Sequence, residues 1–474
     1  MQPDGNRYIE HETTIFSLNI TNLPEIVLIN IMEYLTLKDR YYLSVTCQLF
    51  KELFNHPTLW KAAHIIICMD EIQWHQRSVT EKTVTHIIDK YSYFFQHLYL
   101  EVSGYVQPFN EACLRLFQSL KKDSRLESLT IKVGKVASSK PNAQRFATAH
   151  SDYRDLPNVV DLIDKSKHLR RLTIISWPLH IDLGEQNNLF IALLNDKQML
   201  QLEQLSLFYL DIKRDLWAQR IPKLPTVETT LKLVSHFRHL VCLSLRSPML
   251  NDDIIKELAS VHRTKLHTLQ ILIMYSREHK VELISPSAWT MLNSASPILR
   301  VEYLVTNRIP FEQLSLMLSP EIPLSSFTVL NYGRCDEQVV EMLYNYYNKT
   351  LEKFISLCDS SHCDKALVQL VSSCSKLKHF VYHGEIYCKT IKDLSDIINL
   401  SKRRLYCFDF KVKNIAIEEE PINLDETAIA KDARSQEYYL VSMHQWHQDE
   451  DNRAKQLELM KIHVSQSFGY KWNI

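Results

Sequence analysis

Apolar residues are unusually dense between Pro24 and Leu35, where they recur at helical spacing. A stripe at i, i+3, i+4 and i+7 is enough to pack a helix onto its own domain, and here it comprises Leu28, Ile31, Met32 and Leu35. A second stripe on an adjacent face comprises Val27, Ile31 and Tyr34. Because a small domain cannot cover both, the pattern predicts that a partner covers the second stripe. A helix buried on all sides within a larger core is the alternative.

Two further short helices are expected after this one. Thr36 and Asp39 have the spacing of a capping box, which predicts that a second helix opens here. Thr46 is predicted to cap a third helix, which His56 and Pro57 would end. Pro24 fits the first turn of the first helix, where its missing N–H costs nothing. Trp60 then returns a large aromatic ring to the cluster.

A short pattern of the form L-x-x-L-x-L recurs along most of the remaining chain. The clear copies are Leu126-Leu129-Ile131, Leu169-Leu172-Ile174, Leu202-Leu205-Leu207, Leu240-Leu243-Leu245, Leu266-Leu269-Ile271, Leu324-Phe327-Val329, Leu377-Phe380-Tyr382 and Leu405-Phe408-Phe410. Weaker copies lie at Phe95-Leu98-Leu100, Ile298-Val301-Tyr303 and Leu351-Phe354. The copies are roughly 26 to 43 residues apart, at or beyond the length of leucine-rich repeats.

Amphipathic helices are expected between these strands, with Asn251 and Asp336 as examples of their caps. Each strand–helix unit can bury its apolar face only against its neighbours, so the units should stack into one solenoid of short parallel strands alternating with helices. The asparagine that normally ends a leucine-rich strand is missing from nearly all copies, which indicates a divergent form. An unrelated α/β domain with short buried strands is the alternative.

The predicted organisation is a polar lead-in over residues 1–20, a three-helix unit over 21–62, the solenoid over 63–417 and a helical C-terminal cap over 418–474. A strand is expected from Ala62 to Cys68, followed by helical spacing between Trp74 and Tyr93. Polar or proline-containing stretches at 135–157 and 217–225 are predicted to be surface loops. The cap would cover the open end of the solenoid core.

Composition narrows the class of protein further. Lys and Arg total 55 and Asp and Glu total 55, so no global charge draws the chain to nucleic acid or anionic lipid. With only 7 glycines, the chain cannot supply the turns of a kelch or WD-repeat propeller. The N-terminus has no apolar signal core and no apolar run is long enough to span a membrane. Ten cysteines without a CxxC pair predict reduced thiols, and hence the cytosol or nucleus.

Few residues offer chemistry of their own. Cys358, His362, Cys363 and Cys374 have some of the donors of a zinc site, but without a second close pair they are expected to be core or surface residues. No nucleotide-binding, hydrolase or metalloprotease motif occurs, so neither a metal nor a cofactor is expected. The basic run from Lys165 to Arg171 is predicted to be a solvated helix end rather than a nucleic-acid site.

The segment LPEIVLINIMEYLTLKDRYYLSVTCQLFKELFNHPTLWK resembles the F-box, the motif that docks on the Skp-family adaptor of cullin–RING ubiquitin ligases. Thr46 departs from the family pattern, which prefers valine before the cysteine. By this resemblance, the residues that would form or support the adaptor interface are Leu23, Pro24, Ile26, Ile31, Leu35, Cys47 and Trp60. The resemblance also implies a non-catalytic subunit.

The expected function is therefore a substrate receptor of a Skp–cullin–F-box ubiquitin ligase. The F-box would hold the adaptor while the solenoid binds a protein target for ubiquitination and degradation. Strand residues that alternate with the core leucines should face the concave surface, and we expect target contacts from Arg171, Gln204, Arg246, Gln270, His379 and His383. An F-box scaffold that does not drive turnover is the alternative, and an enzyme of unknown type is a third.

Overall fold

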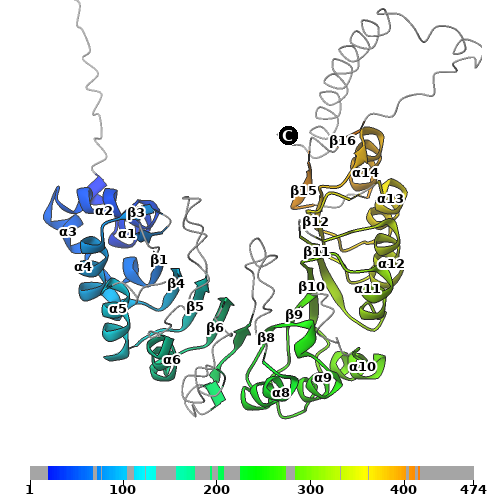
Figure 1. Ribbon diagram of the computed structural model, residues 1–474. Coiled ribbons are helices and arrows are strands. Elements are labelled where there is room, and N and C mark those ends of the chain that lie inside the picture. Colours follow the sequence, from blue (N-terminus) through cyan, green and yellow to red (C-terminus); the bar gives the residue numbers. More distant parts are fainter. Residues whose placement is uncertain are drawn as a thin grey trace, which may run out of the picture.

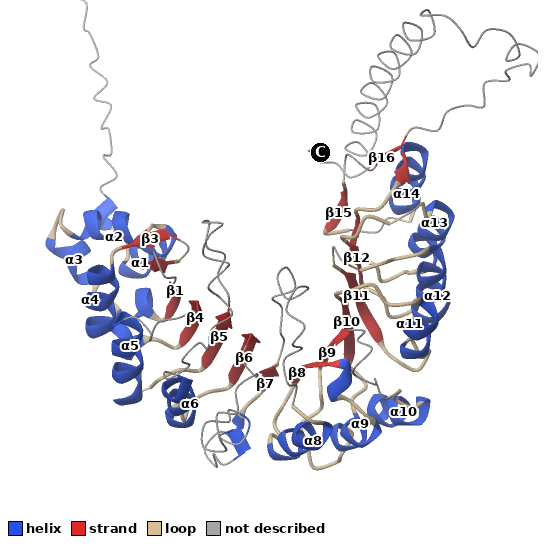
Figure 2. Cartoon of the chain, viewed as in Figure 1, coloured by secondary structure: helices blue, strands red, loops and turns tan. Residues whose placement is uncertain are grey.

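The computed structural model describes residues 20–67, 72–75, 77–103, 111–122, 124–134, 156–176, 190, 193–194, 201–207, 225–273, 283–330, 333–360, 362–401, 405–411 and 415–416. These residues form a curved arc with strands along its inner side and helices along its outer side (Figures 1 and 2). The predicted cap at 418–474 and almost all of the lead-in at 1–20 lie outside the described residues, as do nearly all of the two predicted loops.

The N-terminal unit has the three predicted helices. It consists of the 3-10 turn η1 (Ile20–Asn22), α1 (Glu25–Tyr34), α2 (Leu37–Ser44), α3 (Gln48–Phe54) and the 3-10 turn η2 (Pro57–Trp60). Thr36 caps α2 as expected, because its Oγ1 accepts a hydrogen bond from the Asp39 N–H at 3.1 Å. The Asp39 side chain reaches back to the Thr36 hydroxyl, which donates to Oδ2 at 2.7 Å, instead of to the backbone N–H of a full capping box. Pro24 stands at the N-cap of α1, one position before the first turn.

The predicted cap at Thr46 is wrong. The third helix begins one residue later than expected, with Cys47 at its N-cap and no side-chain cap bond. The Thr46 hydroxyl instead donates to the Leu43 carbonyl at 2.7 Å, within the turn that ends α2. A hydroxyl between two helices can either donate to a carbonyl at the end of the first helix or accept from an N–H at the start of the second. The Thr46 hydroxyl does the former.

The strands form a 14-stranded sheet in the order β15-β13-β12-β11-β10-β9-β8-β7-β6-β5-β4-β1-β2-β3. In chain order the strands of this sheet are β1 (Ala62–Ile67), β2 (Ile72–Trp74), β3 (Arg77–Val79), β4 (His97–Ser103), β5 (Ser128–Gly134), β6 (Arg171–Ser176), β7 (Gln204–Ser206), β8 (Cys242–Arg246), β9 (Thr268–Ile273), β10 (Arg300–Val305), β11 (Leu324–Val329), β12 (Lys353–Ser356), β13 (His379–Tyr382) and β15 (Cys407–Phe410). Pairing is parallel except at β2 and β3, which pair antiparallel. A minor sheet joins β14 (Ile386–Tyr387) to β16 (Ile415–Ala416).

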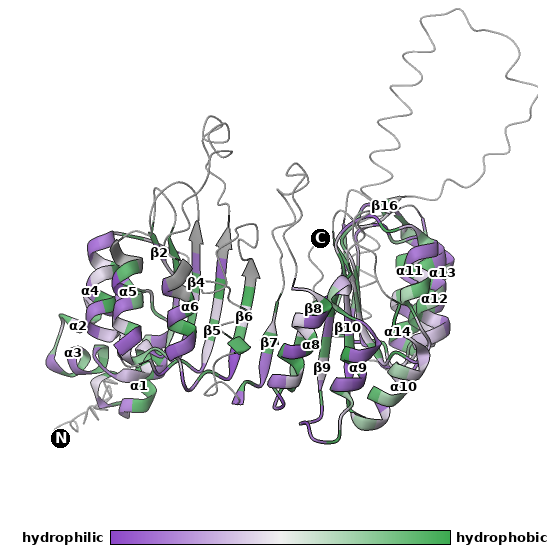
Figure 3. Cartoon of the chain, turned by 60° about the horizontal axis from the view of Figure 1, so that its bottom comes forward, coloured by the Kyte–Doolittle hydropathy of each residue, from purple (hydrophilic) through white to green (hydrophobic). Residues whose placement is uncertain are grey.

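Helices cover the outer side of this sheet (Figure 2). They are α4 (Glu81–Tyr91), α5 (Glu111–Lys122), α6 (Leu156–Lys165), α8 (Val227–His236), α9 (Asp252–Leu258), α10 (Pro286–Ala295), α11 (Phe311–Met317), α12 (Glu337–Tyr347), α13 (Asp364–Ser373) and α14 (Cys388–Leu400). Hydrophobic and hydrophilic residues share these helices, as expected for elements packed on one side only (Figure 3). No described helix is long and apolar enough to cross a membrane.

The repeats are joined by the same backbone contact at the start of successive strands. The Lys61 carbonyl accepts hydrogen bonds from both Gln96 N–H and His97 N–H, at 2.8 and 2.9 Å. The same paired bond recurs at the carbonyls of Gln96, Glu127, Arg170, Glu203, Val241 and Glu352. From Lys61 to Val241 these paired bonds follow one another without a break, so the starts of β1 and of β4 to β9 form a row of backbone contacts along one edge of the arc.

The core runs the length of the solenoid as ladders of matching positions. Leu129, Leu172, Leu205, Leu243 and Leu269 occupy one row of paired strand positions, and all are buried. The weaker copies beginning at Phe95 and Leu351 are full members of the ladder, as β4 and β12.

At β10 the predicted pattern holds at its two strand positions, because Val301 and Tyr303 are buried and pair with Leu269 and Ile271 of β9. Only its first position differs. Ile298 is 60% exposed, and the neighbouring Leu299 is buried instead.

The hairpin of β2 and β3 was not expected, because helical spacing predicted one helix from Trp74 to Tyr93. The helix α4 covers only Glu81–Tyr91, and Trp74 closes a strand. Each strand of the hairpin has three residues, too few for an alternation to register as a strand. His75, at the turn, has a positive φ of 47°.

Candidate functional site

Apolar side chains predominate on the side of α1 that faces away from the protein, where Glu25, Asn30 and Glu33 are also exposed. Its exposed positions include Ile26, Val27, Ile31 and Tyr34, with Ile26 at 62% and Tyr34 at 92% exposure. The opposite side buries Leu28, Ile29 and Met32. Ile31, expected to serve both stripes, therefore belongs to the outward one, and Ile29 takes its place in the core. A helix that is apolar on both sides indicates that another surface covers the outward one.

Exposed apolar residues continue onto the second helix. Tyr41, Tyr42 and Val45 are all exposed, on α2 and at its C-terminal end. Two isolated tyrosines would be ordinary on a monomer, but here they follow the outward face of α1 within one three-helix unit. The outward faces of α1 and α2 are together called the α1–α2 apolar surface below.

The residues expected at an adaptor interface divide into exposed and supporting positions. Pro24, Ile26 and Ile31 are exposed along α1, and Cys47 is exposed at the start of α3. Leu23 and Leu35, on either side of α1, are half-buried. Trp60 is only 1% exposed, so it supports the surface from within rather than forming part of it.

Trp60 is the centre of an aromatic cluster that joins the three-helix unit to the solenoid. Its ring stacks on Tyr91 of α4 with centroids 3.8 Å apart and planes at 3°. Phe54 of α3 meets it edge-on at 5.3 Å, and Trp74 of β2 lies at 6.2 Å. The Trp60 indole N–H donates to the Phe54 carbonyl at 2.8 Å, which satisfies its one polar group.

Arg40 on α2 holds the end of α1. Its Nε donates to the Met32 carbonyl at 2.7 Å and the Leu35 carbonyl at 3.1 Å, and its Nη2 donates to the Glu33 carbonyl at 2.8 Å. Burial lowers the pKa of Arg40, and the charge of Glu33 partly offsets that effect. The sequence reasoning missed this residue, although a cation placed after a helix end is a known partner for its last carbonyls.

Asn55, at the end of α3, makes a second connection to α4. Its Oδ1 accepts hydrogen bonds from Lys90 Nζ at 2.9 Å and from the Tyr91 hydroxyl at 2.7 Å. Its Nδ2 donates to the Lys51 carbonyl at 2.8 Å, so the amide cannot rotate away. No sequence motif marks this residue. The stacked rings of Trp60 and Tyr91 and the hydrogen bonds of the Asn55 side chain thus connect the three-helix unit to α4 of the solenoid.

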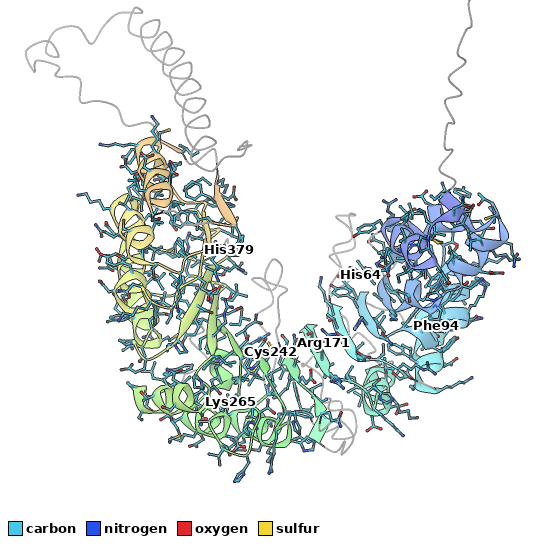
Figure 4. All side chains as sticks on the ribbon, turned by 180° about the vertical axis from the view of Figure 1, so that it is seen from behind. His64, Phe94, Arg171, Cys242, Lys265 and His379 are labelled. Atoms are coloured by element: carbon cyan, nitrogen blue, oxygen red, sulfur yellow. The ribbon has the colours of Figure 1, made fainter. Side chains whose placement is uncertain are left out.

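The concave face presents the other group of expected residues. Strand pairing sets exposed Arg171 beside half-buried Gln204, and half-buried His379 between Lys353 and Cys407. Figure 4 labels Arg171, Cys242 and His379 along this side. Burial and the nearby Lys353 and Lys378 lower the pKa of His379.

Two of the expected concave residues belong to polar networks. Gln270 accepts from the Ser244 hydroxyl at 2.7 Å and donates to Glu302 at 2.8 Å, which links three neighbouring strands. His383 lies 3.1 Å from an Asp409 carboxylate oxygen. Arg246 differs from the expectation, because it is 2% exposed and does not reach the solvent. The alternation of strand residues predicts to which face of the sheet a side chain points, but it does not predict whether other parts of the chain cover that side chain.

The cysteines near residue 360 that the structure describes are core residues. Within the described residues, no three His, Cys, Asp or Glu side chains are placed to hold a metal. Cys358, Cys363 and Cys374 are buried, and burial raises the pKa of Cys363 to about 11, which keeps it a thiol. His362 stacks on Tyr387 at 4.2 Å and lies 3.2 Å from Asp364.

The basic run from Lys165 to Arg171 spans the end of α6 and the start of β6. Lys165, Lys167 and His168 are exposed, and Arg170 pairs with Glu203 at 3.0 Å. Mixed pairing of this kind is typical of a solvated edge. The groove beside it, lined in part by Arg125, Glu127 and Arg170, carries both signs of charge.

Comparisons with known proteins agree with this division into two parts. Residues 20–66 match the F-box-like family model. F-box/LRR-repeat protein 21 of Mus musculus is 23% identical over 317 residues, which cover 66% of this chain and 64% of that protein. The Ovis aries protein of the same name is 20% identical over 411 residues, which cover 85% of each chain. The mouse match therefore spans less than two thirds of the mouse protein.

Among solved structures, the crystal structure of the TLR13-ssRNA13 complex matches 68% of this chain and 52% of that one, with 10% identity and a TM-score of 0.25. These comparisons do not show the particular resemblance to F-box only protein 33 that the stretches Ile298–Leu324 and Cys374–Gly384 and the tail from Tyr439 suggest. The chain thus combines an F-box-like domain at residues 20–66 with an α/β repeat solenoid related to that of F-box/LRR-repeat proteins.

Proposed function

We propose that this protein is the substrate-recognition subunit of a Skp–cullin–F-box ubiquitin ligase. The α1–α2 apolar surface binds the Skp-family adaptor, and through it a cullin–RING ligase. The observation that carries this proposal is the outward face of α1, where four apolar side chains are exposed within a domain that matches the F-box-like model. Burial of such a face contributes roughly 25 cal/mol per Å² before the costs of association are met.

The solenoid binds the protein target on its concave face in this proposal. Arg171, Gln204, Gln270, His379 and His383 are partly or fully accessible there, whereas Arg246 is not. Catalysis is then proximity, because the receptor holds a target lysine near a charged ubiquitin-conjugating enzyme and no residue of this chain bonds to ubiquitin. The stacked Trp60 and Tyr91 support this role, since a rigid joint fixes the target relative to the adaptor. The proposed compartment is the cytoplasm or nucleus.

The test is co-purification of the adaptor with the full chain. Ile26→Arg with Ile31→Arg places two charges on the outward face of α1, and we expect adaptor binding to fall by about tenfold or more. Val261→Arg with Leu400→Arg is the matched control, because both residues are exposed and apolar but lie in the solenoid. Equal adaptor binding by the two double variants, with equal melting temperatures, would remove the support for this surface.

Target turnover needs a separate measurement. Proteins that bind the solenoid are identified by proximity labelling with the wild type and with the Ile26→Arg, Ile31→Arg variant. Their levels should rise on proteasome inhibition and on loss of adaptor binding if the chain is a receptor. Partner levels that change in neither case would identify a scaffold that binds the adaptor without driving turnover.

A further inference from the structure

A basic groove separates the F-box-like domain from the first repeat. It encloses about 1480 Å³ between α2 and α3 on one side and β3 and α4 on the other. Its lining carries the cations Lys38, Arg40, Lys51, Arg77, Lys82 and Lys90 but only one carboxylate, Glu33. In a chain with equal numbers of acidic and basic residues, this is a strong local excess of positive charge. A cleft lined by one sign of charge concentrates its electric field on whatever enters.

Half of these cations are not engaged by the protein itself. Arg40 is bonded to the carbonyls at the end of α1, Lys90 is bonded to Asn55, and Lys38 lies over the Tyr42 ring. The exposed side chains of Lys51, Arg77 and Lys82 form no hydrogen bond or ion pair with another described residue. They come from α3, β3 and α4, so both walls of the groove contribute a cation without a partner.

Beneath the cations the groove contains apolar side chains. Trp74, Ile87 and Tyr91 are among its lining residues and all three are buried. The rings of Trp74 and Tyr91 are covered at 4% and 3% exposure, and the exposed rings in the lining, Tyr34 and Tyr41, lie on the α1–α2 side of the groove. Cations on both walls above an apolar base suit a polypeptide that presents carboxylates at its sides.

The groove is not made by the F-box-like domain alone. The family match ends at residue 66, while Trp74, Arg77, Lys82 and Lys90 lie beyond it. Its far wall includes β3 of the hairpin, the one place where the described sheet departs from parallel pairing. Tyr34, Tyr41 and Val45 of the α1–α2 apolar surface also line it, so the groove continues from the proposed adaptor surface onto residues that lie beyond the F-box-like domain.

We propose that the groove binds an Asp- and Glu-rich segment of the target protein, as a second contact beside the concave face. The inference rests on the proposed receptor function. Lys51, Arg77 and Lys82 pair with carboxylates of the bound segment, and the segment lies across the joint between the two parts of the molecule. Its binding weakens as salt is added, because the pairs are exposed.

The test uses the full chain and a fluorescent twelve-residue peptide of alternating Glu and Ser, with the Gln-for-Glu peptide as the uncharged counterpart. Fluorescence anisotropy should show binding of the Glu peptide only. Lys51→Glu with Arg77→Glu and Lys82→Glu should weaken it by about tenfold or more. The matched variant, Lys122→Glu with Lys167→Glu and Lys232→Glu, changes net charge equally at exposed sites on the solenoid and should bind as the wild type does.

The outcomes separate the possibilities. Absence of wild-type binding, or equal loss in the two triple variants, overturns the groove as an acidic-peptide site. Tighter binding of a labelled oligouridylate than of the Glu peptide overturns it in favour of nucleic acid. Adaptor co-purification should survive the groove variant; its loss assigns the groove to the adaptor and overturns target binding there. Failure of the Ile26→Arg, Ile31→Arg test would instead count against the receptor function itself.

Discussion

The helices α1 and α4 are of similar length and lie in adjoining parts of the molecule, yet their outward faces differ. The outward face of α1 presents Ile26, Val27, Ile31 and Tyr34. The exposed positions of α4 are all polar, namely Glu81, Lys82, Thr83, His86, Asp89 and Lys90. Both helices bury a proper core face, so the difference is not one of folding. The exposed side chains of α4 are polar and need no cover from water, whereas the exposed apolar side chains of α1 indicate that another surface covers them.

The contacts between the three-helix unit and α4 hold the exposed face of α1 in place. Trp60, Phe54 and Tyr91 fill the space between α3 and α4, and Arg40 fixes the end of α1. Stability should therefore depend on residues behind the face and binding on residues in front of it. Four substitutions test this division.

Trp60→Ala should have the largest effect. Removing a fully buried indole that stacks on Tyr91 leaves a cavity, and we expect a loss of about 3–5 kcal/mol in the free energy of unfolding. Chemical denaturation measures it. An unchanged midpoint would show that the cluster does not hold the two parts together.

Arg40→Met should follow at about 2–3 kcal/mol, because it leaves the carbonyls of Met32, Glu33 and Leu35 without their charged donor. Lys38→Met is the control on the same helix, since Lys38 is exposed and bonds no backbone group in the described residues. Similar denaturation curves for the two variants would argue against the role given to Arg40.

Asn55→Ala should cost about 1–2 kcal/mol, since it removes the shared acceptor of Lys90 and Tyr91 and the bond to Lys51. Asn30→Ala, on the outward face of α1, serves as the control because Asn30 is exposed. Hydrogen exchange of α4 should also accelerate in the Asn55 variant only. Equal exchange in the two variants would place the connection elsewhere.

Tyr34→Ala should change the free energy of unfolding least, by no more than about 0.5 kcal/mol, because the ring is 92% exposed. Adaptor binding should nevertheless weaken by about tenfold, as expected for an aromatic residue at the centre of an interface. Tyr346→Ala on α12 is the control, since this partly exposed tyrosine lies far along the solenoid. If both tyrosines leave adaptor binding unchanged, the contrast between α1 and α4 has no functional meaning.

Periodicity predicted the repeat strands well because the burial of a strand residue depends mainly on its position within that strand. Leu129, Leu172 and Leu205 fall where alternation places them, since a strand side chain has only two directions to point. The pattern failed at the first position of the β10 copy, where Leu299 rather than Ile298 is buried, and where strands are too short to show a pattern, as in the β2–β3 hairpin.

The candidate site was predicted only in part for a similar reason. The exposed stripe of α1 follows from its own spacing, apart from the exchange of Ile29 for Ile31 in the core. Arg40, Asn55 and Tyr91 act across segments separated by as many as 36 positions, and nothing in their neighbours marks them. The burial of Arg246 likewise depends on distant parts of the chain.

The paired hydrogen bonds at the strand starts have a consequence for how such a chain can change. At seven carbonyls of the described chain they join one repeat to the next along one edge, so an insertion there would break two bonds at once. The opposite edge of the sheet, where the strands end, accepts longer connections. There, 21 residues separate the end of β5 at Gly134 from the start of α6 at Leu156. Further residues can therefore be inserted after the strands without disturbing the paired hydrogen bonds at the strand starts.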